Sequence, residues 1–195
     1  MSKFRANIEK SEISTMPTVA FTGRIITIDT VADTDKAVKA LSGEKLLGID
    51  TETRPSFKKG VQHVVSLIQI STQDTCFLIR LNRVGMPDSL VSLLENRKIT
   101  KIGLSLHDDY QALCQRRKFK AGGFLDLQKH VGEFGIEEMS LQKIYAIIFG
   151  QRISKSQQLT NWENDVLTDK QKLYAATDAW ACINIYNRLK QEKKI

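Results

Sequence analysis

The sequence KLLGIDTET, residues 45–53, predicts a buried strand that ends in two acidic side chains. Its leucines and isoleucine form the short apolar run that is typical of a central strand. Because side chains alternate along a strand, Asp50 and Glu52 point to the same face. Two adjacent carboxylates repel each other, and a divalent cation is the usual remedy. The pair therefore indicates a metal site, with two unconnected acids at a solvated strand end as the alternative.

Apolar patterns on either side of this strand predict alternating strands and helices. Further strands are expected at 25–28, 64–71, 75–81 and 100–105, with another short apolar segment at 122–130. Helices are expected at 31–41, 88–96, 106–117, 139–150 and 168–190. Only the turn-like TQD separates the second strand of this set from the third, which favours an antiparallel hairpin. The order of elements predicts an α/β fold with a mixed sheet.

Three helix ends carry local signals. Asp88 is the expected N-cap of the helix at 88–96. Thr168 and Gln171 have capping-box spacing at the start of the last helix. Gly150 is expected to end the helix before it.

Length and composition limit the class of protein. The chain has 195 residues, of which 42% are hydrophobic and 26% are charged, so we expect a folded chain rather than a disordered one. Residues 1–18 are polar and aperiodic and are predicted to be a flexible arm, which leaves 19–195 as a single domain. No apolar run approaches the roughly 20 residues that cross a bilayer, and no secretory signal is recognisable. We therefore expect no membrane partner and a cytoplasmic protein, with nucleoid or nuclear residence left open.

The net charge of +7 favours a polyanionic partner, because basic side chains contact phosphates and release counterions. Cys76, Cys114 and Cys182 are far apart and odd in number, which predicts neither a zinc site nor a disulfide framework. We expect these thiols to serve as small apolar residues.

Two further segments place acids at inner positions of predicted helices. In LHDDYQALCQ, Asp109 borders the inward stripe, whereas Asp108 is turned about 100° further toward solvent. In LYAATDAWACINIY, Tyr174 and Asp178 are four residues apart and share one face of a helix that is apolar over most of its circumference. The alternatives are helix-start acids favoured by the macrodipole and a Tyr–Asp hydrogen bond within the core.

Together these residues define a candidate catalytic site. Asp50, Glu52, Asp109 and Asp178 contribute about −4 in charge, which two Mg²⁺ or Mn²⁺ ions would neutralise. Two-metal phosphodiester hydrolysis has this requirement: one ion lowers the pKa of the attacking water, and the other stabilises the leaving oxygen. Tyr174 would orient that water or help to deprotonate it.

The same residues resemble the motifs of the DEDD superfamily of 3′→5′ exonucleases. The first motif is D-x-E after an apolar strand, and the second is an Asp early in a helix after a glycine-containing strand, here KIGLSLHDD. The third is Y-x-x-x-D, whose tyrosine marks the DEDDy branch. The resemblance covers roughly residues 20–190 and points to the ribonuclease D-like group. Residues 159–189 are especially similar to the exonuclease domain of the Werner syndrome helicase.

This resemblance implies a ribonuclease H-like fold with a mixed sheet of five or six strands flanked by helices. It also implies two Mg²⁺ or Mn²⁺ ions and stepwise release of nucleoside 5′-monophosphates from a 3′ end. The second motif departs from the family pattern because His107 and Asp108 precede Asp109, although Asp109 is the better match. Neither the helical nucleic-acid-binding domains of ribonuclease D nor a helicase region is recognisable. We therefore expect lower processivity, or dependence on a helicase or another nucleic-acid-processing partner.

Residues outside the acidic set are candidate substrate contacts. The long polar stretch 150–165 carries Arg152 and Lys155, which are candidates for phosphate contacts. Trp162 in the same stretch is a candidate for base stacking, but anchoring of the loop in the core is the stronger expectation. Thr51 within the first motif and Arg54 just after it complete the set.

The leading hypothesis is a DEDDy exonuclease that acts on single-stranded or 3′-recessed ends, with DNA slightly favoured over RNA. An RNA-processing exoribonuclease of ribonuclease D type is the first alternative, and the treatment of the 2′-OH would distinguish the two. A catalytically silent nucleic-acid-binding module is a second alternative, against which the intact acids argue. The Y-x-x-x-D helix disfavours a ribonuclease H-like endonuclease.

Overall fold

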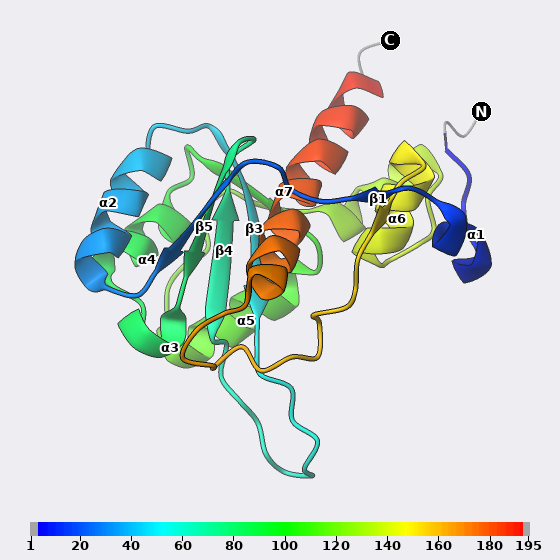
Figure 1. Cartoon of the computed structure of the whole chain (residues 1–195). Helices are drawn as coiled ribbons and strands as arrows, with labels where there is room; N and C mark the ends of the chain where they lie inside the picture. Colours follow the sequence, from blue (N-terminus) through cyan, green and yellow to red (C-terminus); the bar gives the residue numbers. More distant parts are fainter. Residues whose placement is uncertain (1–3, 193–195) are drawn as a thin grey trace.

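Strand β3 (Leu46–Glu52) lies within a six-stranded mixed sheet in the computed structural model, which describes residues 4–192 (Figure 1). The other strands are β2 (Arg24–Ile28), β4 (Leu67–Ser71), β5 (Thr75–Ile79), β6 (Thr100–Gly103) and β7 (Phe124–Asp126). Their order across the sheet is β2-β5-β4-β3-β6-β7. β3, β4 and β5 form an antiparallel meander, whereas β2, β6 and β7 pair in parallel with their neighbours. The predicted α/β fold and the antiparallel hairpin are confirmed.

Helices cover both faces of this sheet. On one face, α2 (Val31–Leu41), α4 (Asp88–Glu95) and α5 (Leu106–Arg116) share an apolar core with Leu47 and Ile49 of β3. On the other face, α7 (Asp169–Glu192) crosses the strands (Figure 1). α7 approaches β3 so closely that a Cβ added at Gly48 would lie 2.0 Å from the carbonyl oxygen of Ala179. Glycine at this position therefore allows the helix to pack directly on the strand.

Several shorter elements connect these layers. They are α3 (Leu81–Val84), the 3-10 helices η1 (Leu127–Lys129) and η2 (Val131–Phe134), and α6 (Leu141–Phe149). α6 packs against α7 and ends at Gly150, whose φ of 64° lies in the left-handed region, as the sequence predicted.

The capping box at the start of α7 is confirmed. The backbone N–H of Gln171 donates to Thr168 Oγ1 over 3.2 Å, and that of Thr168 donates to Gln171 Oε1 over 3.0 Å. The predicted Asp88 cap is wrong, because Pro87 occupies the N-cap position and Asp88 is the first helical residue. The Asp88 carboxylate instead accepts a hydrogen bond from Arg117 over 2.6 Å.

The first residues of the described chain form backbone hydrogen bonds with distant parts of the protein. They include α1 (Lys10–Thr15) and β1 (Thr18–Val19), and β1 pairs in parallel with β8 (Arg152–Ile153). The backbone N–H of Glu137 also donates to the carbonyl oxygen of Ala6. These partners lie more than 100 residues away, so no local sequence pattern predicted α1 or β1. Residues 1–3 of the predicted arm lie outside the described part, and the mobility of the arm stays a prediction.

Across residues 4–192, none of the helices combines the length and the apolar character that a membrane span requires. Cys76, Cys114 and Cys182 are buried free thiols, which confirms their expected use as small core residues.

Candidate active site

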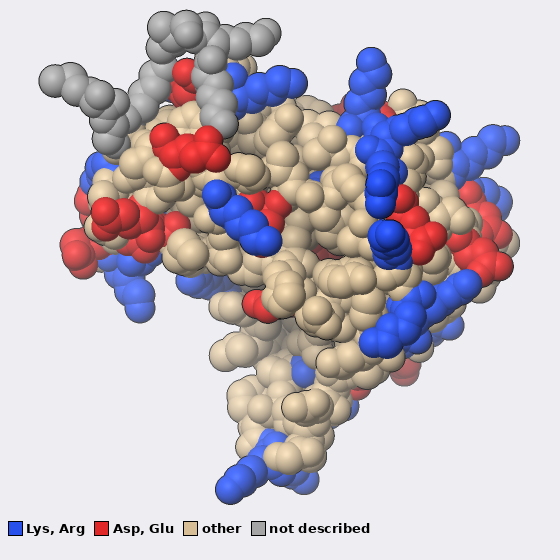
Figure 2. Space-filling view, turned by 180° about the vertical axis from the view of Figure 1, so that it is seen from behind, with Lys and Arg blue, Asp and Glu red and all other residues tan. Residues whose placement is uncertain are grey.

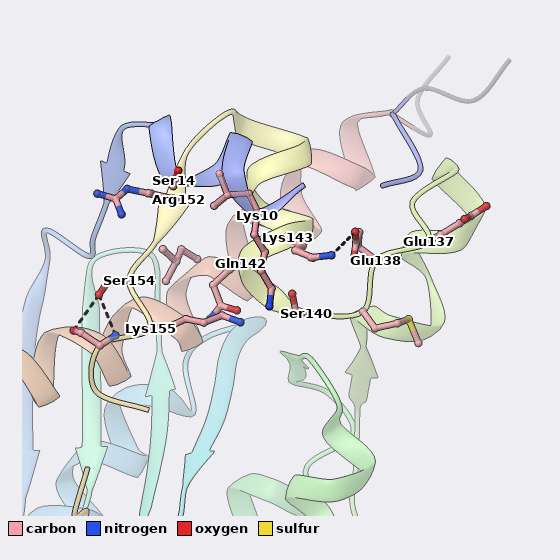
Figure 3. Close-up of a pocket in the computed structure, with 14 residues that line it drawn as sticks. Lys10, Ser14, Glu137, Glu138, Ser140, Gln142, Lys143, Arg152, Ser154 and Lys155 are labelled. Atoms are coloured by element: carbon pink, nitrogen blue, oxygen red, sulfur yellow. Dashed lines mark hydrogen bonds and ion pairs between the residues drawn. The ribbon is translucent and has the colours of Figure 1, made fainter. Parts of the chain in front are cut away.

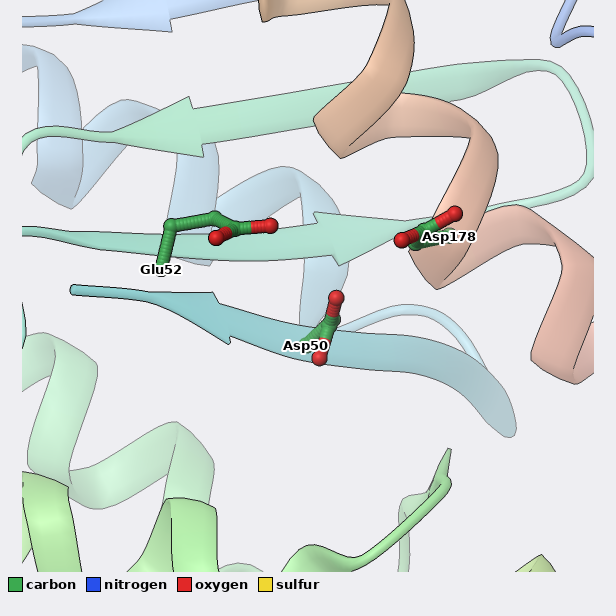
Figure 4. Close-up of side chains that lie close together, drawn as sticks. All are labelled: Asp50, Glu52 and Asp178. Atoms are coloured by element: carbon green, nitrogen blue, oxygen red, sulfur yellow. The ribbon is translucent and has the colours of Figure 1, made fainter. Parts of the chain in front are cut away.

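Three carboxylates meet where α7 crosses the end of β3. Asp50 and Glu52 lie on the strand and Asp178 lies on the helix, and their side chains approach one another (Figure 4). Each offers a ligand oxygen, and these oxygens all lie within 4.8 Å of one another. Glu52 and Asp178 are only 8% and 4% exposed, so these carboxylates are largely removed from water. The expectation that both strand acids share one face is confirmed by this geometry.

Asp109 approaches the same strand from α5, beside the acidic triad. Thr51 Oγ1 donates a hydrogen bond to Asp109 Oδ1 over 2.5 Å. β6 pairs with β3 only along residues 46–48, so the first turn of α5 lies beside the end of β3. Asp109 is half-buried and Asp108 is exposed, as the helical geometry predicted. The structure therefore favours Asp109 over its neighbour as the fourth acid of the site.

A strained turn that the sequence did not reveal leads into α5. Ser105 has a φ of 60°, the only left-handed value among non-glycine residues from 4 to 192. Its backbone N–H donates to Asp126 Oδ1 over 3.0 Å, and the same oxygen accepts from the N–H of Gln128 over 3.1 Å. Asp126 thus connects the end of β7 to the turn that orients Asp109. Such strain often occurs at functional sites, but sequence periodicity does not report it.

Tyr174 lies one turn before Asp178 on α7 and lines the same cavity. Burial and the negative charges of Asp178, Glu52 and Asp50 raise the pKa of its phenol above the usual range. The ring is 6.0 Å, centroid to centroid, from that of Trp162. Tyr174 is therefore held as a protonated phenol beside the acids.

Burial raises the pKa of the four acids. Burial, followed by the charges of Asp178 and Asp109, raises the pKa of Glu52 to about 9. The pKa of Asp50 lies well above its usual range through burial and the charges of the other three acids. Burial also raises the pKa of Asp178 and of Asp109 to about 7, although hydrogen bonding by Tyr174 and Thr51 opposes the rise. At neutral pH the four carboxyls cannot all ionise unless positive charge joins them.

The donor set fits a divalent cation. Asp178 Oδ1 is buried and accepts no hydrogen bond from any residue in the range 4–192. Carboxylate oxygens are preferred ligands of Mg²⁺ and Mn²⁺, and a cation among the three acids would also reduce their repulsion. A cavity of about 310 Å³ opens over the acids and leaves space for further ligands.

The two candidate phosphate contacts lie in different places. Lys155 lines the acidic cavity, and its charge lowers the pKa of Asp178 against the larger effect of burial. Arg152 lines a neighbouring groove instead, and its Nε donates to the carbonyl oxygen of Met16 over 3.1 Å. The structure therefore places Lys155, but not Arg152, in the lining of the acidic cavity.

Base stacking by Trp162 is contradicted by its burial. The side chain is 0% exposed and packs in a core cluster with Leu67, Leu78 and Tyr174. The alternative prediction, a core anchor for the loop, is confirmed.

The loop that contains Trp162 has two further anchors, whose contacts with the loop carried no local sequence signal. The buried Arg80 donates to the carbonyl oxygens of Asn164 and Asp165. Gln171 Nε2 donates to Thr160 Oγ1 over 2.9 Å. The loop beside the site is therefore fixed from both the sheet and α7.

A second loop, residues 53–66, projects from the end of β3 (Figure 1). Arg54 at its base forms an ion pair with Glu163 over 3.1 Å, which joins this loop to the one that holds Trp162. Lys and Arg side chains mark the tip of the projection (Figure 2), and Phe57 in this loop is 83% exposed. The assigned partner of Arg54 is thus an acid of the protein, and its contact with substrate stays a prediction.

Comparison with known proteins gives one family. Residues 25–194 match the family model described as 3′-5′ exonuclease. The mouse bifunctional 3′-5′ exonuclease/ATP-dependent helicase WRN is 30% identical over 95% of this chain, and an Arabidopsis thaliana 3′-5′ exonuclease is 28% identical over 95%. The chain spans 14% of the first relative and 70% of the second. The structure of Escherichia coli RNase D superposes with a TM-score of 0.79 at 21% identity, covering 88% of this chain and 45% of that one.

Proposed function

The chain belongs to the 3′-5′ exonuclease family, and from this premise we propose that it removes nucleotides one at a time from nucleic-acid 3′ ends. The products in this proposal are nucleoside 5′-monophosphates. The observation that carries it is the triad of Asp50, Glu52 and Asp178, in which Glu52 and Asp178 are buried and the ligand oxygens all lie within 4.8 Å of one another. Three converging carboxylates fit phosphodiester hydrolysis assisted by divalent cations better than they fit a purely structural role.

We assign the cation ligands to the triad together with Asp109, which would hold two Mg²⁺ or Mn²⁺ ions. When bound, divalent cations neutralise the acids, activate water and stabilise the leaving oxygen. Thr51 positions Asp109 through its 2.5 Å hydrogen bond. The Thr51 hydroxyl is thereby engaged with the acid, so we assign it to the support of the site.

We assign Tyr174 to orientation of the attacking water. Burial and the neighbouring acids raise the pKa of its phenol, so at neutral pH the hydroxyl keeps its proton and donates a hydrogen bond. A phenol in this state is a poor general base, which favours orientation over proton removal. Lys155, on the wall of the same cavity, supplies positive charge for the phosphate of the terminal nucleotide.

DNA is the favoured substrate in this proposal. The mouse relative, at 30% identity, joins the exonuclease to a helicase, whereas the exoribonuclease RNase D resembles this chain in fold at 21% identity. RNA is the competing substrate, and the 2′-OH is the group that would separate the two.

The test uses DNA and RNA oligonucleotides of one sequence, labelled at either end, with Mg²⁺, Mn²⁺ or EDTA. We expect mononucleotides from the 3′ end in the presence of metal and none in EDTA. Asp50→Ala/Glu52→Ala and Asp109→Ala should abolish release, whereas the matched control Asp108→Ala alters an exposed acid and should retain it. Activity that survives EDTA or the double substitution would exclude the mechanism. Tight binding with no product under any metal would indicate the silent module instead.

A further inference from the structure

A groove of about 910 Å³ adjoins the acidic cavity, between α1, residues 137–143 and residues 152–156 (Figure 3). Met139, Ser140, Gln142 and Lys155 line both spaces, so the groove continues from the site. Its outer wall includes α1, which precedes the part of the chain that matches the family model. The groove is thus completed by a segment that the family match does not cover.

The start of α6 forms the inner wall of this groove. α6 has nine residues, and its N-cap, Ser140, makes no side-chain hydrogen bond to the first turn. The free N–H groups of a helix start carry partial positive charge and bind phosphate oxygens. The first turn lines both the groove and the acidic cavity.

Gln142 is an independent indication of a ligand at this place. Its side chain is only 9% exposed, yet its amide makes no hydrogen bond to any residue of the described chain. In Figure 3 it extends into the groove, which Lys10 and Lys155 also line. Because this amide faces the groove without a protein partner, its N–H groups are free to donate to a ligand that supplies acceptor atoms.

The charges of the groove select an anion. Glu138 is already engaged, since it accepts from Lys143 Nζ over 2.8 Å and from the N–H of Ile8 over 3.3 Å. Glu137 accepts from Asn7 over 3.1 Å and extends away from the groove (Figure 3). Lys10 forms no ion pair with a carboxylate of residues 4–192, so its charge remains available, whereas the charge of Lys155 also acts on Asp178.

We propose that this groove binds the phosphodiester backbone of a single strand immediately 5′ of the scissile bond. Gln142 and the first turn of α6 hold one phosphate, and Lys10 on α1 holds the next. The proposal rests on the proposed function, because the strand is defined by the 3′ end that lies at the acids. Continuity with the acidic cavity and the unpaired charge of Lys10 favour a nucleic-acid strand over a protein as the occupant.

The test compares a dinucleotide with a decanucleotide of the favoured polymer. In Lys10→Gln, kcat/KM for the decanucleotide should fall about fivefold more than for the dinucleotide, because only the longer strand reaches α1. The slope of log affinity against log salt should also become shallower by about 0.7. Gln142→Leu should weaken decanucleotide binding about tenfold, since it removes a hydrogen bond to a charged group. Lys39→Gln, on α2 across the sheet, is the matched control and should change neither quantity.

Equal effects on both substrates, or none, in an active protein would place the strand elsewhere and overturn the proposal. A wild-type protein that cleaves no polymer would contradict the proposed function instead. Fluorescence anisotropy of a labelled decanucleotide in EDTA then tests the groove proposal independently of activity. Weaker binding by Lys10→Gln than by the wild type supports the proposal, and equal binding overturns it. A change in oligomeric mass by light scattering, with equal decanucleotide binding, would assign the groove to a protein contact.

Discussion

The two faces of β3 carry side chains of opposite character. Leu47 and Ile49 point into an apolar core beneath α2 and α4, where both side chains are fully buried. Asp50 and Glu52 point toward α7, where burial raises the pKa of both carboxyls. Because the side chains alternate, one seven-residue strand serves both purposes. One face of β3 therefore stabilises the fold, whereas the other opposes it and carries the acids of the candidate site.

A substitution among the acids that meet at β3 and α7 should reduce activity without reducing stability. Asp178→Asn keeps the volume of the side chain and removes a charge from a place where burial raises its pKa. We expect activity to fall on the order of 10³-fold or more, because positioned charge at the reacting phosphate is lost. We also expect an unchanged or raised Tm in the absence of metal. Exonuclease rates and thermal unfolding of the same preparation check both, and a destabilised but active variant would contradict this division of roles.

The apolar face should give the opposite result. Leu47→Ala removes a fully buried side chain from the core and should lower the free energy of unfolding by about 2–5 kcal/mol. Activity per folded molecule, at a temperature where the variant is folded, should stay near that of the wild type. Urea unfolding followed by rate measurement checks this, with the exposed Lys39→Ala as control. A large loss of activity in folded Leu47→Ala would show that the two faces are not separable.

Tyr174→Phe tests a single hydroxyl group beside the four acids. The change removes one hydroxyl and leaves all four acids in place, so we expect kcat to fall about 10²-fold. The affinity for Mn²⁺, measured by isothermal titration calorimetry, should stay close to that of the wild type. Unchanged kcat would remove Tyr174 from the catalytic set, whereas lost Mn²⁺ binding would place it among the cation ligands.

The smallest expected effect concerns pH. The pKa of Glu52 rises from an ordinary 4.5 to about 9 on folding, so between these values the folded state binds more protons than the unfolded state. The stability that Glu52 contributes to the folded state is therefore fully present below pH 4.5 and is lost as the pH rises through about 9. Metal-free Glu52→Gln should lose less stability with rising pH and exceed the Tm of the wild type at pH 8 by about 2–8 °C.

Thermal unfolding in EDTA from pH 5 to pH 9 measures this difference. Glu44→Gln alters an exposed acid and is the matched control. Parallel curves for wild type and Glu52→Gln would show that the burial of Glu52 does not contribute to the pH dependence.

Local patterns predicted the parts of the site that obey a short period. The i, i+2 spacing of Asp50 and Glu52 and the i, i+4 spacing of Tyr174 and Asp178 placed each pair correctly on its own element. Helical geometry also distinguished Asp109 from its neighbour.

Features that depend on distant partners could not be predicted in this way. β1 exists because it pairs with β8, and Asp88 is used by Arg117 rather than by its own helix. Gln142 lines a groove between α1 and the start of α6, and no window of sequence contains both elements.

Gly48 has a consequence for the dimensions of the acidic triad. Its contact on α7 is Ala179, so the point where helix and strand touch is two residues from Asp50 and one residue from Asp178. The separation of these carboxylates therefore depends on residue 48 having a hydrogen atom where alanine would have a methyl group. A single carbon added at this position would push α7 away from β3 and change the distances between the acids, although every acid would still be present in the sequence.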